Sequence, residues 1–436
     1  MNMDILELVE TKKEKLVHCR RDLHKHPETA WTEFRTAAIV AETLVGLGYQ
    51  VAVGEAVINP EDMMGVPSEQ ELTRQQERAI AQGADPNWVS KMQGGKTGVM
   101  GVMQFAQPGP VVAFRFDMDA NDVTEAMLET HRPWREGFAS VNAGAMHACA
   151  HDGHTAIGLT LAEVIAEMKN NLAGTVKLIF QPAEEGVRGA KAMASSGIVD
   201  DVDFFVGLHL GIGLKQTGTM TCNTVGFLAT TKLDAVYTGV PAHAGAAPET
   251  GKNALLAAAT AVLNLHAISR HSSGASRINV GVLQAGTGRN VIPGKAVVKL
   301  ETRGTTSEIN DYMYQQAIRI LEAAAAMYDV KLDVTPMGGA ANCENSPQLV
   351  ERLQQVAEAS HLFESILPSG NIGGSEDCTY LMERVQQKGG QAAYLMVGTQ
   401  LAAGHHDSYF DFDETCLVSA TALLAKTAAE LLRDSK

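Results

Sequence analysis

The densest group of reactive side chains lies between Met146 and His154, where three histidines, one cysteine and one aspartate occur within nine residues. If this stretch is extended, Cys149 and His151 project from the same face, because they are two residues apart. A thiolate beside an imidazole favours a transition metal over calcium or magnesium. Asp152 is then expected to be the N-cap of a helix over 155–170. The alternative for this stretch alone is a loop whose histidines make only structural hydrogen bonds.

A second group, Gln181–Gly186, follows directly after the apolar run TVKLIF. Ligands collect at the carboxyl ends of parallel strands, so this is the expected position of an active site. Adjacent carboxylates point in different directions, so one of Glu184 and Glu185 could bind metal while the other takes a proton from water. Taken alone, a Glu-Glu pair is more often part of a solvated loop.

Other potential ligands follow further apolar runs. VDFFVGLH ends at His209, which alone would more often be a core histidine with its hydrogen bonds satisfied. The remaining groups are Asp117-Met118-Asp119 after VVAFRF, Gly404–Asp407 after AAYLMVG, and Gly373–Asp377. Because so many strand ends and following loops carry potential ligands, the sequence predicts a metal site at one edge of a sheet.

Two glycine-bordered segments carry further polar groups. Pro241–Gly245 contains His243, and Gly288–Pro293 contains Arg289 and Asn290. These side chains could hold a developing oxyanion or a substrate carboxylate. The alternative is that both segments are ordinary turns.

The elements that must position these groups are indicated by apolar periodicity. A polar interval at 55–96 is typical of an insertion and carries one short helix. Helices and strands alternate elsewhere, which predicts an α/β fold with a mostly parallel sheet covered on both faces. The expected helices are 4–25, 34–48, 154–170, 188–196 and 413–435, and the expected strands are 98–105, 111–116, 175–180, 202–209 and 392–398.

Between 226 and 340 the pattern changes to strand, helix, strand, strand, helix, strand, which is the order of a ferredoxin-like α+β domain. We therefore expect a discontinuous metal-binding catalytic domain over 1–225 and 341–436, interrupted by this smaller domain. A chain of 436 residues is also longer than one hydrophobic core usually supports.

Composition excludes several classes of function. The net charge of -15, without a basic stripe, argues against a nucleic-acid partner. No apolar run approaches the roughly 20 residues that span a bilayer, and the first residues lack the apolar region of a signal peptide. The six scattered cysteines form no disulfide framework. We therefore expect a cytoplasmic protein with no membrane association.

The motifs from RRDLHKHPE at 20–28 to HHDSYFDFDE at 405–414 occur in the order found in a known superfamily. Together they resemble the two-metal amidohydrolases, which include aminoacylases, hippurate hydrolases, plant auxin-conjugate hydrolases and bacterial carboxypeptidases. The resemblance covers nearly the whole chain. No G-x-S-x-G elbow of a serine hydrolase and no Walker loop competes with it.

The resemblance implies two divalent metal ions, with manganese or zinc expected. Cys149 would bridge them, and the other ligands would be His151, Glu185, His209 and His406. Members of the family place the last ligand four residues before an aromatic residue, here Phe410, so the resemblance implies His406, and His405 remains the alternative. Glu184 would be the general base, and Asp117 would contact the metal ligands without binding metal itself.

For the inserted domain, the resemblance implies a lid and dimerisation role. His243 would reach across a dimer, with Asn290 and Arg303 near the substrate carboxylate. The implied reaction cleaves the amide bond of a small acidic N-acyl amino acid, in a homodimer or with a homologous second subunit. The alternatives are a broader N-acyl amino acid or dipeptide hydrolase, and a poorly active chain that supports a homologous catalytic partner.

One position departs from the family pattern, because Ala150 stands where Cys-Gly-His-Asp is usual. Alanine fits without strain if its φ is negative, and it is strained if its φ is positive.

Overall fold

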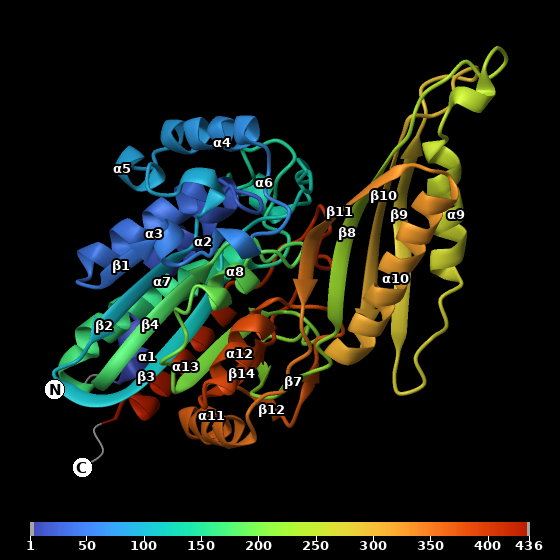
Figure 1. Ribbon diagram of the computed structural model, residues 1–436. Helices are drawn as coiled ribbons and strands as arrows, with labels where there is room; N and C mark the ends of the chain where they lie inside the picture. Colours follow the sequence, from blue (N-terminus) through green and yellow to red (C-terminus); the bar gives the residue numbers. More distant parts are fainter. Residues whose placement is uncertain (1–3, 434–436) are drawn as a thin grey trace. The chain divides into compact units, whose positions relative to one another are not determined.

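The computed structural model describes residues 4–433, which form two compact units. Within that range, the large unit contains residues 4–225, 343–373 and 377–433. The small unit contains Gly226–Asn342 and Gly374–Glu376. Figure 1 colours both units along the chain.

The large unit is built on an eight-stranded sheet with the order β1-β2-β4-β3-β5-β14-β6-β12. Its central strands β4, β3, β5 and β14 are parallel, whereas β1, β2 and β6 pair antiparallel with their neighbours towards the centre. The predicted α/β class with a mostly parallel central sheet is therefore confirmed. The strands are β1 (Gln50–Val53), β2 (Val99–Gln104), β3 (Gln107–Asp117), β4 (Ala173–Gln181), β5 (Phe204–Leu210), β6 (Thr219–Thr221), β12 (Ser365–Leu367) and β14 (Gln391–Val397), with β7 (Thr224–Val225) and β13 (Gly370–Asn371) forming a separate pair.

Helices cover both faces of this sheet. α7 and α13 pack against each other and against β3, while α8 and α12 pack together, with α12 against β5 and β14 (Figure 1). Gly158 lets α7 approach closely, because a Cβ there would lie 2.6 Å from the Phe116 ring and 2.7 Å from the Phe180 ring. The helices are α1 (Ile5–Glu10), α2 (Lys13–Lys25), α3 (Phe34–Gly46), α4 (Glu69–Ala81), α5 (Pro86–Val89), α6 (Arg132–Arg135), α7 (His151–Met168), α8 (Ala190–Ser195), α11 (Pro347–Ser360), α12 (Cys378–Gln387) and α13 (Cys416–Leu431).

Three local predictions need correction. The helix expected over 4–25 is broken between α1 and α2, where the Thr11 hydroxyl donates to the Leu8 carbonyl and competes with the helical ladder. The insertion carries α4 and α5, besides short 3-10 turns, rather than one short helix. Asp152 is not an N-cap, because α7 begins at His151 with Ala150 as its N-cap.

The small unit has the predicted order of elements. Its antiparallel sheet has the order β11-β8-β10-β9, and α9 and α10 pack together and against the sheet. The buried Tyr237 donates its hydroxyl to the Leu321 carbonyl at 3.1 Å, which fixes α10 to β8. The elements are β8 (Ala229–Thr238), α9 (Ala254–His266), β9 (Ser276–Ala285), β10 (Lys295–Gly304), α10 (Ser307–Met327) and β11 (Lys331–Ala340).

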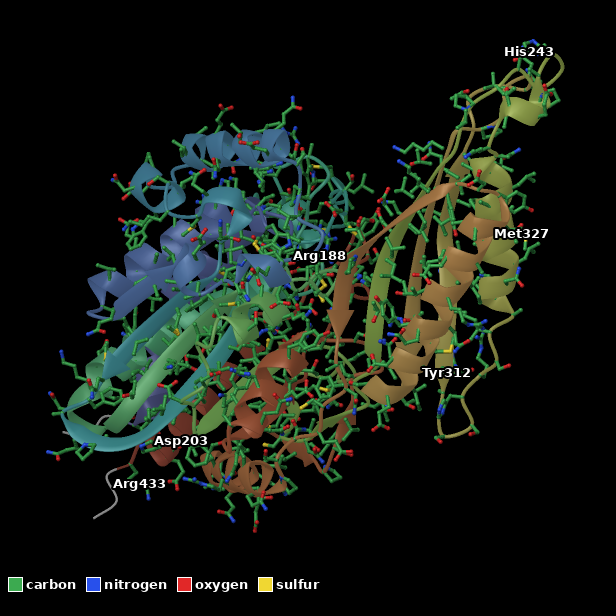
Figure 2. All side chains as sticks on the ribbon, in the orientation of Figure 1. Arg188, Asp203, His243, Tyr312, Met327 and Arg433 are labelled. Atoms are coloured by element: carbon green, nitrogen blue, oxygen red, sulfur yellow. The ribbon has the colours of Figure 1, made fainter. Side chains whose placement is uncertain are left out.

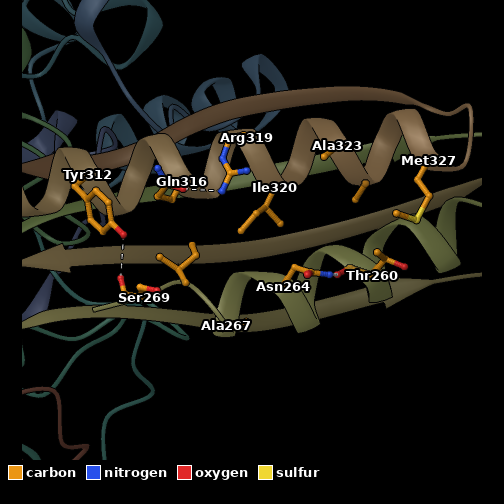
Figure 3. A pocket seen from close by; sticks show the side chains of 12 residues that line it. Thr260, Asn264, Ala267, Ser269, Tyr312, Gln316, Arg319, Ile320, Ala323 and Met327 are labelled. Carbon is orange, nitrogen blue, oxygen red and sulfur yellow. Dashed lines mark hydrogen bonds between the residues drawn. The ribbon is translucent and has the colours of Figure 1, made fainter. Parts of the chain in front are cut away.

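A groove of about 390 Å³ runs between α9 and α10 (Figure 3). At one end Tyr312 donates its hydroxyl to the Ser269 carbonyl at 3.2 Å. Met327 lines the groove and Leu263 lies on α9, with 68% and 75% of their surfaces exposed. Both helices of the small unit therefore expose a large apolar side chain.

Over residues 4–433, none of the helices combines the length and the apolar character needed to span a membrane.

Candidate metal centre

The segment that joins Cys149 to His151 is a tight turn, not the extended backbone expected from the sequence. Ala150 has φ 67° and ψ 13°, which is left-handed, and His151 is the first residue of α7. The turn still buries Cys149 and His151, which are 6% and 1% exposed. A second loop is attached to it, because the His406 backbone N–H donates to the Ala148 carbonyl at 2.8 Å.

Backbone carbonyls fix the orientation of two imidazoles. His151 donates its Nδ1 hydrogen to the Asp119 carbonyl, and His209 donates its Nδ1 hydrogen to the Leu210 carbonyl, each at 2.8 Å. In its neutral form each ring therefore presents an unprotonated Nε2. His209 Nε2 lies 3.5 Å from Cys149 Sγ, and His151 Nε2 is buried without a hydrogen-bond partner. Both nitrogens are thus available to a cation.

The turn after β4 presents the two adjacent carboxylates. Three of its residues have left-handed backbone, namely Ala183 (φ 54°), Gly186 (φ 85°) and Val187 (φ 58°). The Asp119 carboxylate holds this turn, because Oδ1 accepts the N–H of Glu184 at 3.0 Å and Oδ2 accepts that of Glu185 at 2.8 Å. The conformation is strained for Ala183 and Val187 but not for the glycine, and such strain persists only where the surroundings enforce it, commonly at functional sites.

The predicted donors converge in the large unit. Within residues 4–433, three groups of donor atoms that each lie within 4.8 Å of one another combine these side chains. Glu184 Oε2 lies 3.9 Å from His151 Nε2, and Glu185 Oε1 lies 3.3 Å from His406 Nε2. The groups are Cys149–His151–His209, Cys149–Glu185–His406 and His151–Glu184–Glu185.

The structure separates the two late histidines. His406 has a left-handed backbone (φ 64°), is exposed, and joins the group of Cys149 and Glu185. The His405 ring packs 5.0 Å from the Phe410 ring, and burial lowers the pKa of His405 to about 4. Geometry therefore favours His406 as the late donor.

Asp117 lies at the end of β3 with both of its oxygens engaged. Oδ1 accepts from His154 Nδ1 and Oδ2 from Arg115 Nη1, each at 2.6 Å. Burial alone would raise the pKa of Asp117, but His151, His154 and Arg115 hold it well below its usual value. His154 is also engaged on its other nitrogen, because Nε2 accepts the Leu210 N–H at 3.0 Å. Asp117 and His154 therefore form a fixed hydrogen-bonded network next to the donor group.

The electrostatics of the donor set fit bound cations. Burial and the Glu185 charge raise the pKa of the Cys149 thiol well above its usual value, and a nearby cation would reverse that shift. Although burial opposes it, His406 and His151 lower the pKa of Glu185 to about 2. One thiol, two carboxylates and three imidazoles together match the ligand preferences of transition metals.

Comparison with known proteins then decides the family. The model of Peptidase family M20/M25/M40 matches residues 113–430. The chain belongs to this family. It is 53% identical, over 95% of both chains, to one of the subunits of p-aminobenzoyl-glutamate hydrolase from Escherichia coli (strain K12). It is 51% identical over 94% of both chains to indole-3-acetyl-aspartic acid hydrolase of Enterobacter agglomerans.

A solved structure supports the same assignment. The aminobenzoyl-glutamate utilization protein from Klebsiella pneumoniae has 42% sequence identity and a TM-score of 0.84, with 98% of both chains covered. The predicted resemblance to the two-metal amidohydrolases is thus confirmed, and this chain is a metal-dependent amidohydrolase that acts on amide bonds. A dinuclear metal site is typical of the M20 family, and the donor groups above are the candidates for it.

In this M20 chain the other predicted site residues lie in the small unit. His243 and Asn290 occupy neighbouring exposed loops, where the Ala244 N–H donates to the Asn290 carbonyl at 2.9 Å. Figure 2 labels His243 at the tip of that unit. Arg303 lies on β10, and its guanidinium donates to Glu301 through Nε at 3.0 Å and Nη2 at 3.1 Å. The structure therefore brings His243 near Asn290 and leaves Arg303 paired with a carboxylate.

Sequence reasoning misses the buried groups that support the M20 site. It indicates Asp119 only as an acid near a strand end, and it does not predict that this carboxylate holds the Glu184–Glu185 turn. It also misses Arg20 and His24, although both bind Asp152 Oδ2 at 2.8 Å and so anchor the first turn of α7. The available signal is the motif RRDLHKHPE, in which Arg20 and His24 are four residues apart and so lie on the same side of α2.

The left-handed Ala150 leads to a stability prediction. A left-handed conformation costs a residue with a Cβ about 1–2 kcal/mol. Ala150→Gly removes this cost, and the gain should offset the stability lost with the buried methyl group. We expect its free energy of unfolding to be unchanged or slightly higher. The matched control is Ala156→Gly inside α7, which is equally buried and should lose at least about 1 kcal/mol. Urea unfolding of the metal-free protein measures both, and equal losses would contradict the strain.

Proposed function

We propose that this chain hydrolyses N-acyl derivatives of acidic amino acids, with p-aminobenzoyl-glutamate as the first candidate. The observation that carries the proposal is the Glu184 carboxylate beside the donors Cys149, His151 and Glu185. The substrate class is supported by two relatives above 50% identity, whose names specify a glutamate and an aspartate conjugate.

In this proposal Cys149, His151, Glu185, His209 and His406 hold two divalent ions, manganese or zinc. When bound, such ions polarise the amide carbonyl and make an attacking water more acidic. The Asp119 carboxylate accepts hydrogen bonds from the backbone N–H groups of Glu184 and Glu185. These bonds would keep the base Glu184 and the metal ligand Glu185 in separate orientations. Asp117 would stabilise His151 from behind without binding metal.

Glu184 would act as general base and then as general acid. Its carboxylate takes a proton from water as the water oxygen attacks the amide carbon. It then returns that proton to the leaving nitrogen as the carbon–nitrogen bond breaks, which releases the free amino acid and a carboxylic acid. His243 would donate a hydrogen bond to the oxyanion, and Asn290 and Arg303 would hold the substrate's carboxylate.

We further propose that the chain acts as a homodimer, or together with a homologous second subunit. The exposed side chains of Leu263 and Met327 support an association through the small unit. The Escherichia coli relative is named as one subunit of its enzyme, which supports a heteromeric assembly.

We also propose that the chain acts in the cytoplasm. All six cysteines are free, and Cys149 must remain reduced to bind metal, which the reducing cytoplasm allows.

The test is a hydrolysis assay of purified chain with manganese, zinc or no metal, with and without a homologous second subunit. The substrates are p-aminobenzoyl-glutamate, indole-3-acetyl-aspartate and N-acyl derivatives of neutral amino acids. We expect metal-dependent release of glutamate or aspartate. Preferred cleavage of indole-3-acetyl-aspartate would instead favour the second candidate, which the 51% identical relative supports. Activity only in the presence of the second subunit would identify this chain as a supporting one.

Cys149→Ser tests the metal assignment. A hydroxyl is a poor replacement for a thiolate, so metal affinity should fall by at least about 10- to 100-fold, the loss found when only the groups behind the ligands are changed. The free Cys222, which is equally buried but belongs to none of the donor groups of residues 4–433, provides the matched control Cys222→Ser. Elemental analysis after dialysis measures both variants. Unchanged metal content in Cys149→Ser would exclude Cys149 as a ligand.

A further inference from the structure

The guanidinium of Arg188 lies on the same turn as the two adjacent carboxylates. A Cβ built on Gly186 would lie 2.5 Å from Arg188 Nε and 2.9 Å from Nη2, so the guanidinium covers the backbone directly after Glu185. Gly186 is required here both for this space and for its φ of 85°. Arg188 is half-buried, and Figure 2 labels it in the large unit.

The backbone on both sides of this side chain is fixed. The Arg188 N–H donates to the Ala183 carbonyl at 3.0 Å, which closes the turn around Glu184 and Glu185. On the other side, Asp377 Oδ2 accepts the N–H groups of Gly189 at 3.0 Å and Ala190 at 2.9 Å. The guanidinium is thus presented from a rigid support, which is what a binding group requires.

The charge of Arg188 is not neutralised within residues 4–433. Its guanidinium donates to the Gly65 carbonyl, 3.4 Å from Nη1, and it forms no ion pair there. The contrast with its neighbours is informative, because Arg115 pairs with Asp117 at 2.6 Å and Lys191 pairs with Asp62 at 3.0 Å. The guanidinium of Arg188 is thus held on the turn without a carboxylate partner of its own among the described residues.

We propose that Arg188 binds the side-chain carboxylate of the acidic amino acid in the substrate. The inference rests on the proposed function and adds the residue that selects glutamate or aspartate over neutral amino acids. A guanidinium offers two parallel N–H donors to a carboxylate, so it distinguishes a carboxylate from the isosteric amide by charge as well as geometry. Arg188 recognises the leaving amino acid and takes no part in proton transfer.

The experiment measures binding without turnover, using metal-loaded full-length protein that carries Glu184→Gln. Calorimetry compares three probes: p-aminobenzoyl-glutamate, p-aminobenzoyl-glutamine and the α-amide of p-aminobenzoyl-glutamate. Adding Arg188→Met should weaken binding of the first and third probes about 10- to 100-fold and leave the glutamine probe nearly unchanged. Arg188→Lys should restore part of the loss, since it keeps the charge but loses the paired donors.

Lys191→Met is the matched control, because it removes a nearby positive charge that is already paired with Asp62. It should leave all three affinities unchanged. Equal loss for all three probes in Arg188→Met would overturn the inference and indicate a structural role at Gly65. Weaker binding of the glutamate and glutamine probes, with the α-amide unaffected, would also overturn it, because Arg188 would then recognise the α-carboxylate. Failure of the proposed function is seen separately, as absence of hydrolysis by the unsubstituted chain while the binding pattern persists.

Discussion

Glu184→Gln should lower kcat by a factor of about 100 to 10,000 while leaving the metal content unchanged. The amide matches the carboxylate in size, but it cannot accept a proton from the attacking water. The backbone of residue 184 should stay in place, because its N–H donates to Asp119 Oδ1 at 3.0 Å and does not depend on the side chain. Steady-state hydrolysis and elemental analysis on the same sample measure the two effects.

Glu185→Gln is the matched control, because it makes the same chemical change one residue away. The Glu185 carboxylate lies 3.3 Å from His406 Nε2 and belongs to a donor group with Cys149, so this variant should lose metal together with activity. The pair of variants separates a base from a ligand. If Glu184→Gln lost as much metal as Glu185→Gln, Glu184 would be a ligand and another group would have to serve as base.

The fold and the position of candidate donors after the strands could be predicted from local patterns in the sequence, whereas the full ligand set came from the resemblance to the two-metal amidohydrolases. Apolar runs that end in Asp117, Gln181 and His209 are strands β3, β4 and β5, and parallel neighbours must deliver their carboxyl ends to one edge. The order strand, helix, strand, strand, helix, strand likewise predicted the small unit. In each case residues close in the sequence decide the result.

What could not be predicted depends on contacts between distant segments. Residue propensities do not predict the left-handed backbone of Ala150, because alanine normally avoids this conformation. They also do not predict that α7 begins directly after it, at His151. Asp119 binds amides 65 and 66 residues away, and Arg20 binds Asp152 across 132 residues. Such partners can be identified only once the sheet has brought their strands together.

His243 raises a different question, because it belongs to the small unit and is exposed there. Its Nδ1 accepts the N–H groups of Gly245 at 3.1 Å and Ala246 at 3.0 Å. Nδ1 therefore carries no proton, and Nε2 is left as an N–H donor held by a short turn. A fixed N–H donor is suited to an oxyanion, and losing one such donor typically costs about 100- to 1,000-fold in kcat.

His243→Ala should therefore keep its metal and its thermal stability but lose activity by about that factor. If the group acts across a dimer, exchange of protomers with Glu184→Gln should restore activity, because one site of each mixed dimer combines an intact Glu184 with His243 from the other protomer. Random exchange should give about one quarter of the activity of the unsubstituted protein, since half of the dimers are mixed and each has one intact site. Differently tagged protomers, purified over both tags, verify that mixed dimers form. If verified mixed dimers remain as inactive as both parents, His243 does not act across the dimer, and its donor must reach the site of its own chain or serve another purpose.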